Sequence, residues 1–149
     1  MTSDYLIENI ESAFKVWNRR GVAKHYSFDD FCSYVLPYRV AHEPLSHWRR
    51  TALQRYGHWL DSLNAPQDIA RSIAMRYPVR YNAGMTKYPY IMSYEEMDSL
   101  QWGTCDDMTA FLTLSLRAIG IPAATDVVKA WANRSSAHCW NVVKDTAGH

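Results

Sequence analysis

The segment from Cys105 to Ile119 constrains the fold most, because it is apolar around nearly the whole circumference of a helix. Its apolar positions are Met108, Ala110, Phe111, Leu112, Leu114, Leu116, Ala118 and Ile119. A helix of this kind is buried on most faces, so the rest of the chain must pack around it. Gly103 just before it permits a sharp entry, and Gly120-Ile121-Pro122 after it predicts a firm stop.

A cysteine lies in the first turn of this central helix, followed by two acidic residues, Asp106 and Asp107. A thiol at a helix amino end is biased toward thiolate, because the helix dipole and the free N–H groups favour negative charge. Cys105 is therefore a candidate nucleophile. The alternative stays open, since a cysteine on an apolar helix is often buried and inert.

A histidine opens the last apolar run of the chain. The pattern predicts strands over residues 123–131 and 138–143, joined by a turn over 133–136. This hairpin can lie across the helix and bring His138 to Cys105, which would form a nucleophile–base pair. A lone histidine at a strand start is also common as a surface or core residue. Cys139 must face the opposite side from His138, so we expect it in the core.

The first half of the chain predicts helices, because its apolar residues recur at helical spacing. Cap residues and helix breakers place these helices at about 4–20, 27–36, 44–63 and 66–74, with a further helix at 93–100. Ser27 and Ser93 each begin a capping-box pattern. Residues 77–92 lack helical periodicity and predict a loop with a short extended piece.

Composition excludes several classes of function. The chain has 149 residues, enough for one domain, and a net charge of +1, which argues against nucleic acid as a partner. No apolar run is long enough to span a membrane. Three cysteines without a Cys-x-x-Cys pair form neither a disulfide framework nor a zinc knuckle. His42 and His47 are five residues apart with Pro44 between them, so they do not share a helix face, and we predict no metal and no cofactor.

Three motifs together resemble the core of the transglutaminase-like superfamily over roughly residues 95–149. They are Gly103-x-Cys105, Leu116-Arg117-Ala118-Ile119-Gly120-Ile121-Pro122-Ala123 and His138-x-Trp140-Asn141-x-Val143. The resemblance implies an α+β, papain-like fold in which the cysteine-bearing helix packs on a small antiparallel sheet. It implies one domain over 1–149, with a helical leading region at 1–92 and a Cys/His core at 93–149. In this family Cys105 would be the nucleophile and His138 the general base.

The resemblance also implies a third residue, usually an Asp on the strand after the histidine strand, which orients the imidazole. Asp145 is the only acidic residue that follows His138, and it falls in a predicted turn, where an Asp usually binds its own backbone. We therefore expect a domain truncated at its carboxyl end, with the acid beyond it, and keep Asp145 as the weaker candidate. Trp102 and Trp140 are candidate cleft walls, and Trp102 could donate its indole N–H to an oxyanion. Core packing is the alternative role for both tryptophans.

The predicted function is acyl transfer or hydrolysis on a peptide or protein substrate, as in a transglutaminase-like protease or amidase. A non-catalytic interaction or carbohydrate-binding module is the alternative, and a helical scaffold with a structural cysteine is a third. The sequence leaves the acyl acceptor, oligomeric state and compartment open. The N-terminus carries no secretory signal pattern, yet the resembling bacterial proteins are often exported, so export as part of a longer chain remains an expectation.

Overall fold

The computed structural model describes residues 2–62, 65–76, 80–87, 91–130 and 136–147. The α-helices and strands are α1 (Ser3–Arg19), α2 (Phe28–Asp30), α3 (Trp48–Tyr56), α4 (Pro66–Arg76), β1 (Arg80–Tyr81), α5 (Tyr94–Leu100), β2 (Trp102–Gly103), α6 (Cys105–Ala118), β3 (Ala123–Val128) and β4 (His138–Val143). Short 3₁₀ turns at Val22–His25, Gly57–Trp59 and Ala83–Lys87 and a π-helical turn at Phe31–Val35 connect them. The described chain is therefore α+β, which is compatible with a transglutaminase-like core.

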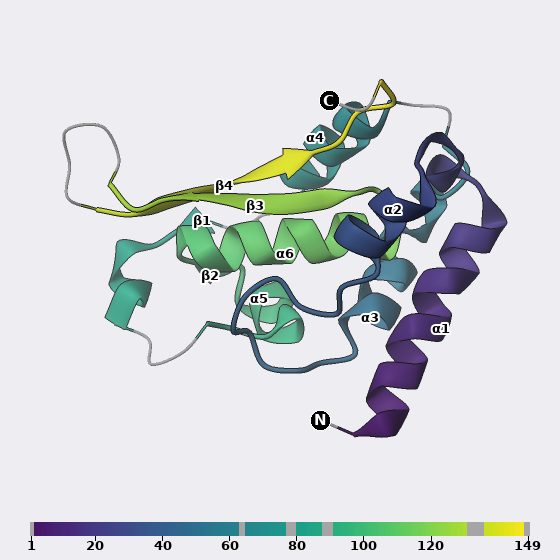
Figure 1. The fold of residues 1–149 in the computed structure, drawn as a ribbon. Coiled ribbons are helices and arrows are strands. Elements are labelled where there is room, and N and C mark those ends of the chain that lie inside the picture. Colours follow the sequence, from purple (N-terminus) through teal and green to yellow (C-terminus); the bar gives the residue numbers. More distant parts are fainter. Residues whose placement is uncertain (1, 63–64, 77–79, 88–90, 131–135, 148–149) are drawn as a thin grey trace.

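Helix α6 lies at the centre, as its apolar circumference predicts. The β3–β4 hairpin runs along one side of α6, and α3 and α5 pack on another (Figure 1). Phe111, Leu114 and Leu116 of α6 are at most 2% exposed and belong to the main hydrophobic core. Burying such side chains stabilises the fold by about 1.5–3 kcal/mol each.

Strands β3 and β4 form an antiparallel pair in which Ala123 lies opposite Val143 and Val128 opposite His138. Side chains alternate along β4: Cys139 is buried, whereas His138 and Trp140 are exposed on the other face. The register places His138 at the end of the hairpin nearer the amino end of α6, and Val143 at the end nearer the Gly120 turn. The predicted burial of Cys139 is confirmed.

A second, parallel pair of strands joins β1 to β2 directly before α6, with Tyr81 opposite Gly103. The backbone N–H of Arg80 donates to the Gln101 carbonyl at 3.0 Å, and that of Asn82 donates to the Gly103 carbonyl at 2.9 Å. The sequence predicted a loop with a short extended piece within residues 77–92, and it did not predict β2. Two-residue strands are too short to show alternation.

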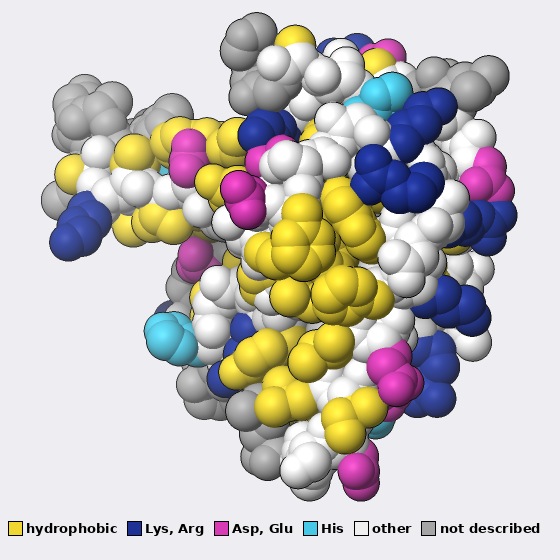
Figure 2. Space-filling model, turned by 45° about the vertical axis from the view of Figure 1, so that its right-hand side comes forward, with side chains coloured by type: hydrophobic (Ala, Val, Ile, Leu, Met, Phe, Trp, Pro, Cys, Tyr) yellow, Lys and Arg dark blue, Asp and Glu magenta, His cyan; other side chains and the backbone are white. Residues whose placement is uncertain are grey.

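A smaller apolar cluster joins α1 to the π-helical turn that follows α2, with Ala13, Phe31 and Val35 buried and Phe14, Trp17 and Leu36 packed against them. Figure 2 shows hydrophobic side chains gathered on the face that α1 and α2 present. Phe28 of α2 and Ile7 of α1 are 53% and 51% exposed. None of the helices in the described ranges has both the length and the apolar character that crossing a bilayer requires.

The helix predicted from Pro44 is shorter than expected, and its predicted start is wrong: α3 begins at Trp48. The carboxylate of Glu43 accepts the backbone N–H groups of Val40 and Ala41 at 2.6 and 2.8 Å, and these bonds hold residues 40–43 as a loop before α3. The helix ends at Tyr56, and Gly57–Trp59 tightens into a 3₁₀ turn.

Most other predicted elements are confirmed. The capping boxes at Ser27 and Ser93 both form, and β4 has the predicted bounds. The second helix is confirmed in place, but its latter half is π-helical. Strand β3 ends at Val128; the predicted strand end at Trp131, residues 133–135 of the predicted turn, and Leu63 and Asn64 lie outside the described residues.

Candidate active site

Cys105 is the first residue of α6, and a capping box fixes it there. Thr104 is the N-cap, and its hydroxyl accepts the backbone N–H of Asp107 at 3.4 Å. The Asp107 carboxylate accepts in return the backbone N–H and the hydroxyl of Thr104, at 2.9 and 2.7 Å. It also accepts the N–H of Met92 at 3.0 Å. Asp107 is only 6% exposed, so this carboxylate ties the loop before α5 to the turn that carries the cysteine.

Gly103 enables the sharp approach to α6. A Cβ at this position would lie 2.5 Å from Cε of Met97 and 2.9 Å from Cβ of Asp107. A side chain is therefore excluded by close packing, because neither contact leaves room for a methyl group. Gly103 also belongs to β2, so the backbone before the cysteine is held from both sides.

Two cavities meet at Cys105. One has a volume of about 410 Å³ and is lined by Ala74, Tyr81, Cys105, Met108, Thr109, Leu112, His138, Cys139, Trp140 and Asn141. The other, of about 460 Å³, is lined by Tyr81, Met85, Thr86, Ile91, Thr104, Cys105, Asp106, Asp107, Ser136 and Ala137. The first is mainly apolar, and the second carries two carboxylates. Cys105 and Tyr81 line both, so a molecule lying across them would pass over the thiol.

His138 and Trp140 reach the apolar cavity from β4. Their rings are 6.4 Å apart, and both lie on the strand face opposite Cys139. Strand β4 is docked on α6 by Asn141, whose amide donates to the Thr109 carbonyl and to the Thr113 hydroxyl, each at 2.8 Å. The structure thus brings Cys105, His138 and Trp140 to the rim of one cavity.

Cys139 lies on the face of β4 that packs on α6. Its Sγ is 3.3 Å from Oδ1 of Asp106 and 3.4 Å from Oγ1 of Thr109. Burial, together with the neighbouring Asp106 carboxylate and Cys105 thiol, raises the pKa of the Cys139 thiol to about 12. Cys139 is therefore a protonated thiol at neutral pH, and its S–H can donate to Asp106.

The ligand atoms of Cys105, Asp106 and Cys139 all lie within 4.8 Å of one another. Two sulfurs and a carboxylate at this spacing are a possible metal-ligand set, although exposed carboxylates such as Asp106 are common without a metal. No local sequence pattern predicts this group, because Cys139 reaches Cys105 only through the packing of β4 on α6.

Two other candidates lie elsewhere. Oδ1 of Asp145 accepts the N–H of Ala147 at 2.8 Å, as expected for a turn Asp, and Asp145 is not among the described residues that line the two cavities. Trp102 is 42% exposed on β2, where Arg80 lies 5.7 Å from its ring centre, and it is likewise absent from the described linings. The indole role predicted for Trp102 stays a prediction.

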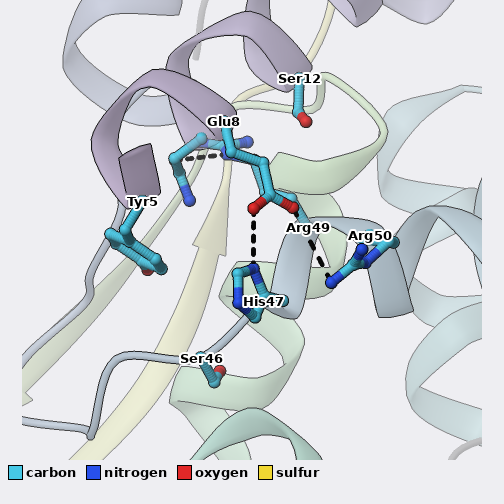
Figure 3. Close-up of a pocket in the computed structure, with 8 residues that line it drawn as sticks. Tyr5, Glu8, Ser12, Ser46, His47, Arg49 and Arg50 are labelled. Carbon is cyan, nitrogen blue, oxygen red and sulfur yellow. Dashed lines mark hydrogen bonds and ion pairs between the residues drawn. The ribbon is translucent and has the colours of Figure 1, made fainter. Parts of the chain in front are cut away.

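A much smaller pocket, about 10 Å³, lies between α1 and the start of α3 (Figure 3). There Glu8 pairs with Nδ1 of His47 at 2.9 Å and with Arg50 at 4.0 Å. These exposed side chains join two helices. The pairing explains the position of His47, whose partner is a carboxylate of α1.

Comparison with known families places the chain in one of them. Residues 51–149 match the family model described as the transglutaminase-like superfamily. The match covers well over half of the chain, including α6 and the β3–β4 hairpin, and the chain belongs to this superfamily. No curated protein and no solved structure matches the chain.

Sequence reasoning missed two residues that shape the site. Asp107 appeared to be a simple helix-start acid, but the Thr104-x-x-Asp107 spacing was itself a capping-box signal. Asn141 carried no assigned role, and its alternation with Cys139 on β4 was the available signal that it faces α6.

Proposed function

We propose that this protein catalyses cysteine-dependent acyl transfer or hydrolysis on a peptide or protein amide. The supporting observation is that Cys105, at the amino end of α6, and His138, at the start of β4, line one apolar cavity of about 410 Å³. Membership of the transglutaminase-like superfamily supports the same chemistry. In this proposal, the Cys105 sulfur attacks the amide carbonyl and His138 protonates the leaving amine.

The two cavities suggest how a substrate lies. An apolar or aromatic side chain of the acyl donor fits beside Met108, Leu112 and Trp140, which line the first cavity. The leaving amine then lies beside Cys105 where the two cavities meet, on the side of the cavity that His138 lines. The part of the substrate beyond that amine extends toward Asp106 in the second cavity, where a carboxylate favours a cationic group. The backbone N–H of Cys105, at the free amino end of α6, is the proposed oxyanion donor.

The pH dependence of alkylation provides the test. Iodoacetamide labelling is followed by mass spectrometry between about pH 5 and pH 9, and exposed Cys32 serves as the reference thiol in the same chain. Cys105 is expected to remain fast at acidic pH, where Cys32 has become slow. Equal pH profiles for the two thiols would contradict the proposal and favour a non-catalytic member of the superfamily.

Two variants assign the partners of the thiol. His138→Ala is expected to abolish the advantage of Cys105 at acidic pH, whereas His42→Ala, at an exposed loop histidine, is expected to leave it unchanged. Asp145→Asn tests the third residue: its turn hydrogen bond favours a small effect. An effect as large as that of His138→Ala would make Asp145 the triad acid.

A further inference from the structure

We propose that Cys105 and Cys139 form a reversible disulfide when a hydroperoxide oxidises the protein, with Asp106 as the base for the second thiol. This modification site goes beyond acyl transfer, because it requires only the two sulfurs, the carboxylate and an oxidant. The inference stands on the geometry between the first turn of α6 and the second residue of β4.

The distance between the sulfurs permits the bond. The two Sγ atoms lie within 4.8 Å of each other, and a disulfide bond is about 2.05 Å long. Closing this gap requires a rotation or small shift of the two side chains. Cys105 is only partly buried, so it is the less confined of the two side chains.

The two thiols differ in their accessibility to an oxidant, as a stepwise oxidation requires. Cys105 is partly exposed at a helix amino end and lines two cavities, so a small peroxide can reach its sulfur. Cys139 is 3% exposed, and this burial shields its sulfur from direct attack by the oxidant. Oxidation therefore begins at Cys105.

Two balanced steps complete the modification. The Cys105 sulfur takes an oxygen atom from the hydroperoxide; the O–O bond breaks, and an alcohol or water leaves. The Cys139 sulfur then attacks the sulfenic sulfur, so that the S–S bond forms and the S–O bond breaks. The Cys139 proton passes to Asp106, whose Oδ1 lies 3.3 Å from the sulfur, and the departing hydroxide takes up a proton as water.

Neighbouring side chains hold Cys139 in place for this attack. Oγ1 of Thr109 lies 3.4 Å from its sulfur, and Thr109 also donates to the Cys105 carbonyl at 2.9 Å. Asn141, two residues further along β4, anchors the strand on α6. The disulfide would occupy the Cys105 sulfur, so it would switch off any chemistry at that atom until a dithiol reductant restored both thiols.

The test uses the full chain treated with hydrogen peroxide, then digested without reduction and analysed by mass spectrometry. The expected product is a peptide pair linking Cys105 to Cys139, which dithiothreitol separates, in wild-type protein and in Cys32→Ser. A chain in which Cys105 proceeds to sulfinic acid without the linked pair would overturn the proposal, as would a disulfide confined to Cys32 between two molecules. This readout does not depend on acyl transfer.

Two variants separate the steps. Cys139→Ser is expected to stop at the sulfenic acid, which dimedone traps, and to over-oxidise with time. Asp106→Asn lies at an exposed position and removes the carboxylate that lies 3.3 Å from the Cys139 sulfur. It is expected to slow disulfide formation about a hundredfold relative to the first oxidation of Cys105, whose rate is measured separately by dimedone trapping in Asp106→Asn combined with Cys139→Ser. An unchanged rate of disulfide formation in Asp106→Asn would overturn the role of Asp106 as the base.

Discussion

The two ends of α6 are held in opposite ways. At the amino end, exchanged hydrogen bonds between Thr104 and Asp107 cap the helix, and two cavities leave Cys105 accessible. At the carboxyl end, Arg117 is 6% exposed and donates to the Ala123 carbonyl at 3.2 and 3.1 Å and to the Arg39 carbonyl at 2.9 Å. The closed end anchors the helix, which allows the other end to stay open to solvent.

Glycines mark both ends, but for different reasons. Gly120 has a φ of +83°, and a Cβ there would lie 3.0 Å from Cγ1 of Val16. Here the backbone conformation and the packing both require glycine. Gly103 has no positive φ, and packing alone excludes a side chain. The carboxyl end is thus fixed by a left-handed glycine and a buried guanidinium, whereas the amino end is fixed by a cap made with the buried carboxylate of Asp107.

The largest expected effect on stability concerns the closed end. The guanidinium of Arg49, 3% exposed, donates to Asn9 Oδ1 at 2.7 Å, to the Val35 carbonyl at 2.6 Å and to the Arg117 carbonyl at 3.4 Å. Burial, with the nearby charge of Arg117, lowers the pKa of Arg49 to about 9. Arg49→Met leaves these buried acceptors without a donor, so we expect a loss of about 3 kcal/mol in unfolding free energy.

Chemical denaturation measures this loss, and the neighbouring arginine is the matched control. Arg50 is exposed and pairs with Glu8 at only 4.0 Å, so Arg50→Met is expected to cost less than about 0.5 kcal/mol. In folded Arg49→Met protein, the alkylation rate of Cys105 should stay near the wild-type rate. Slower alkylation of Cys105 in this variant would mean that the two ends of α6 are coupled rather than held independently.

The second prediction concerns the open end. Thr104→Val removes the hydroxyl that accepts the Asp107 N–H, so we expect a loss of about 1 kcal/mol in unfolding free energy. Because the first turn then frays, we also expect slower alkylation of Cys105 at acidic pH. Thr2→Val removes the equivalent cap of α1 and is the control, since Thr2 accepts the Tyr5 N–H at 3.3 Å far from the cysteine. Equal rates of Cys105 alkylation at acidic pH in the two variants would show that the Thr104 cap does not affect the reactivity of the thiol.

The sequence predicted part of the fold that places the two ends of α6. The bounds of β4 and almost the full length of α6 follow from local patterns of apolar residues and helix breakers. The start of α3 was predicted too early, at Pro44, because no local pattern shows that the loop in which Glu43 binds the Val40 and Ala41 N–H groups continues to His47. Strand β2 was missed because a two-residue strand has no period.

The contacts within the site could not be predicted for a different reason. Alternation along β4 placed Cys139 opposite His138, yet nothing local indicates that its sulfur lies near that of Cys105. That contact depends on where the hairpin docks along α6, which Asn141 fixes through Thr109 and Thr113. Local patterns can define a face of a strand, but the register between elements comes from tertiary packing.

The smallest expected effect concerns the ion pair between Lys144 and Asp30, which joins the end of the hairpin near Gly120 to α2. Nζ of Lys144 lies 2.6 Å from Oδ1 of Asp30, and this hydrogen bond is the main reason that the pKa of Asp30 is lowered. A lowered pKa in the folded state means that the contribution is present above the unfolded value of about 3.9 and is lost as pH falls through the folded pKa. Lys144→Met should therefore cost about 0.5–1 kcal/mol at neutral pH.

The pH dependence of that cost distinguishes the ion pair from simple packing of the lysine stem. Urea denaturation at neutral pH and in the most acidic buffer that keeps the protein folded should give a difference between wild type and Lys144→Met that shrinks with acidification. Lys129→Met is the control, because Lys129 is exposed just beyond the opposite end of β3 and has no recorded ion pair among the described residues. A cost for Lys144→Met that is independent of pH would mean that packing of the Lys144 stem, rather than its charge, holds this end of the hairpin against α2.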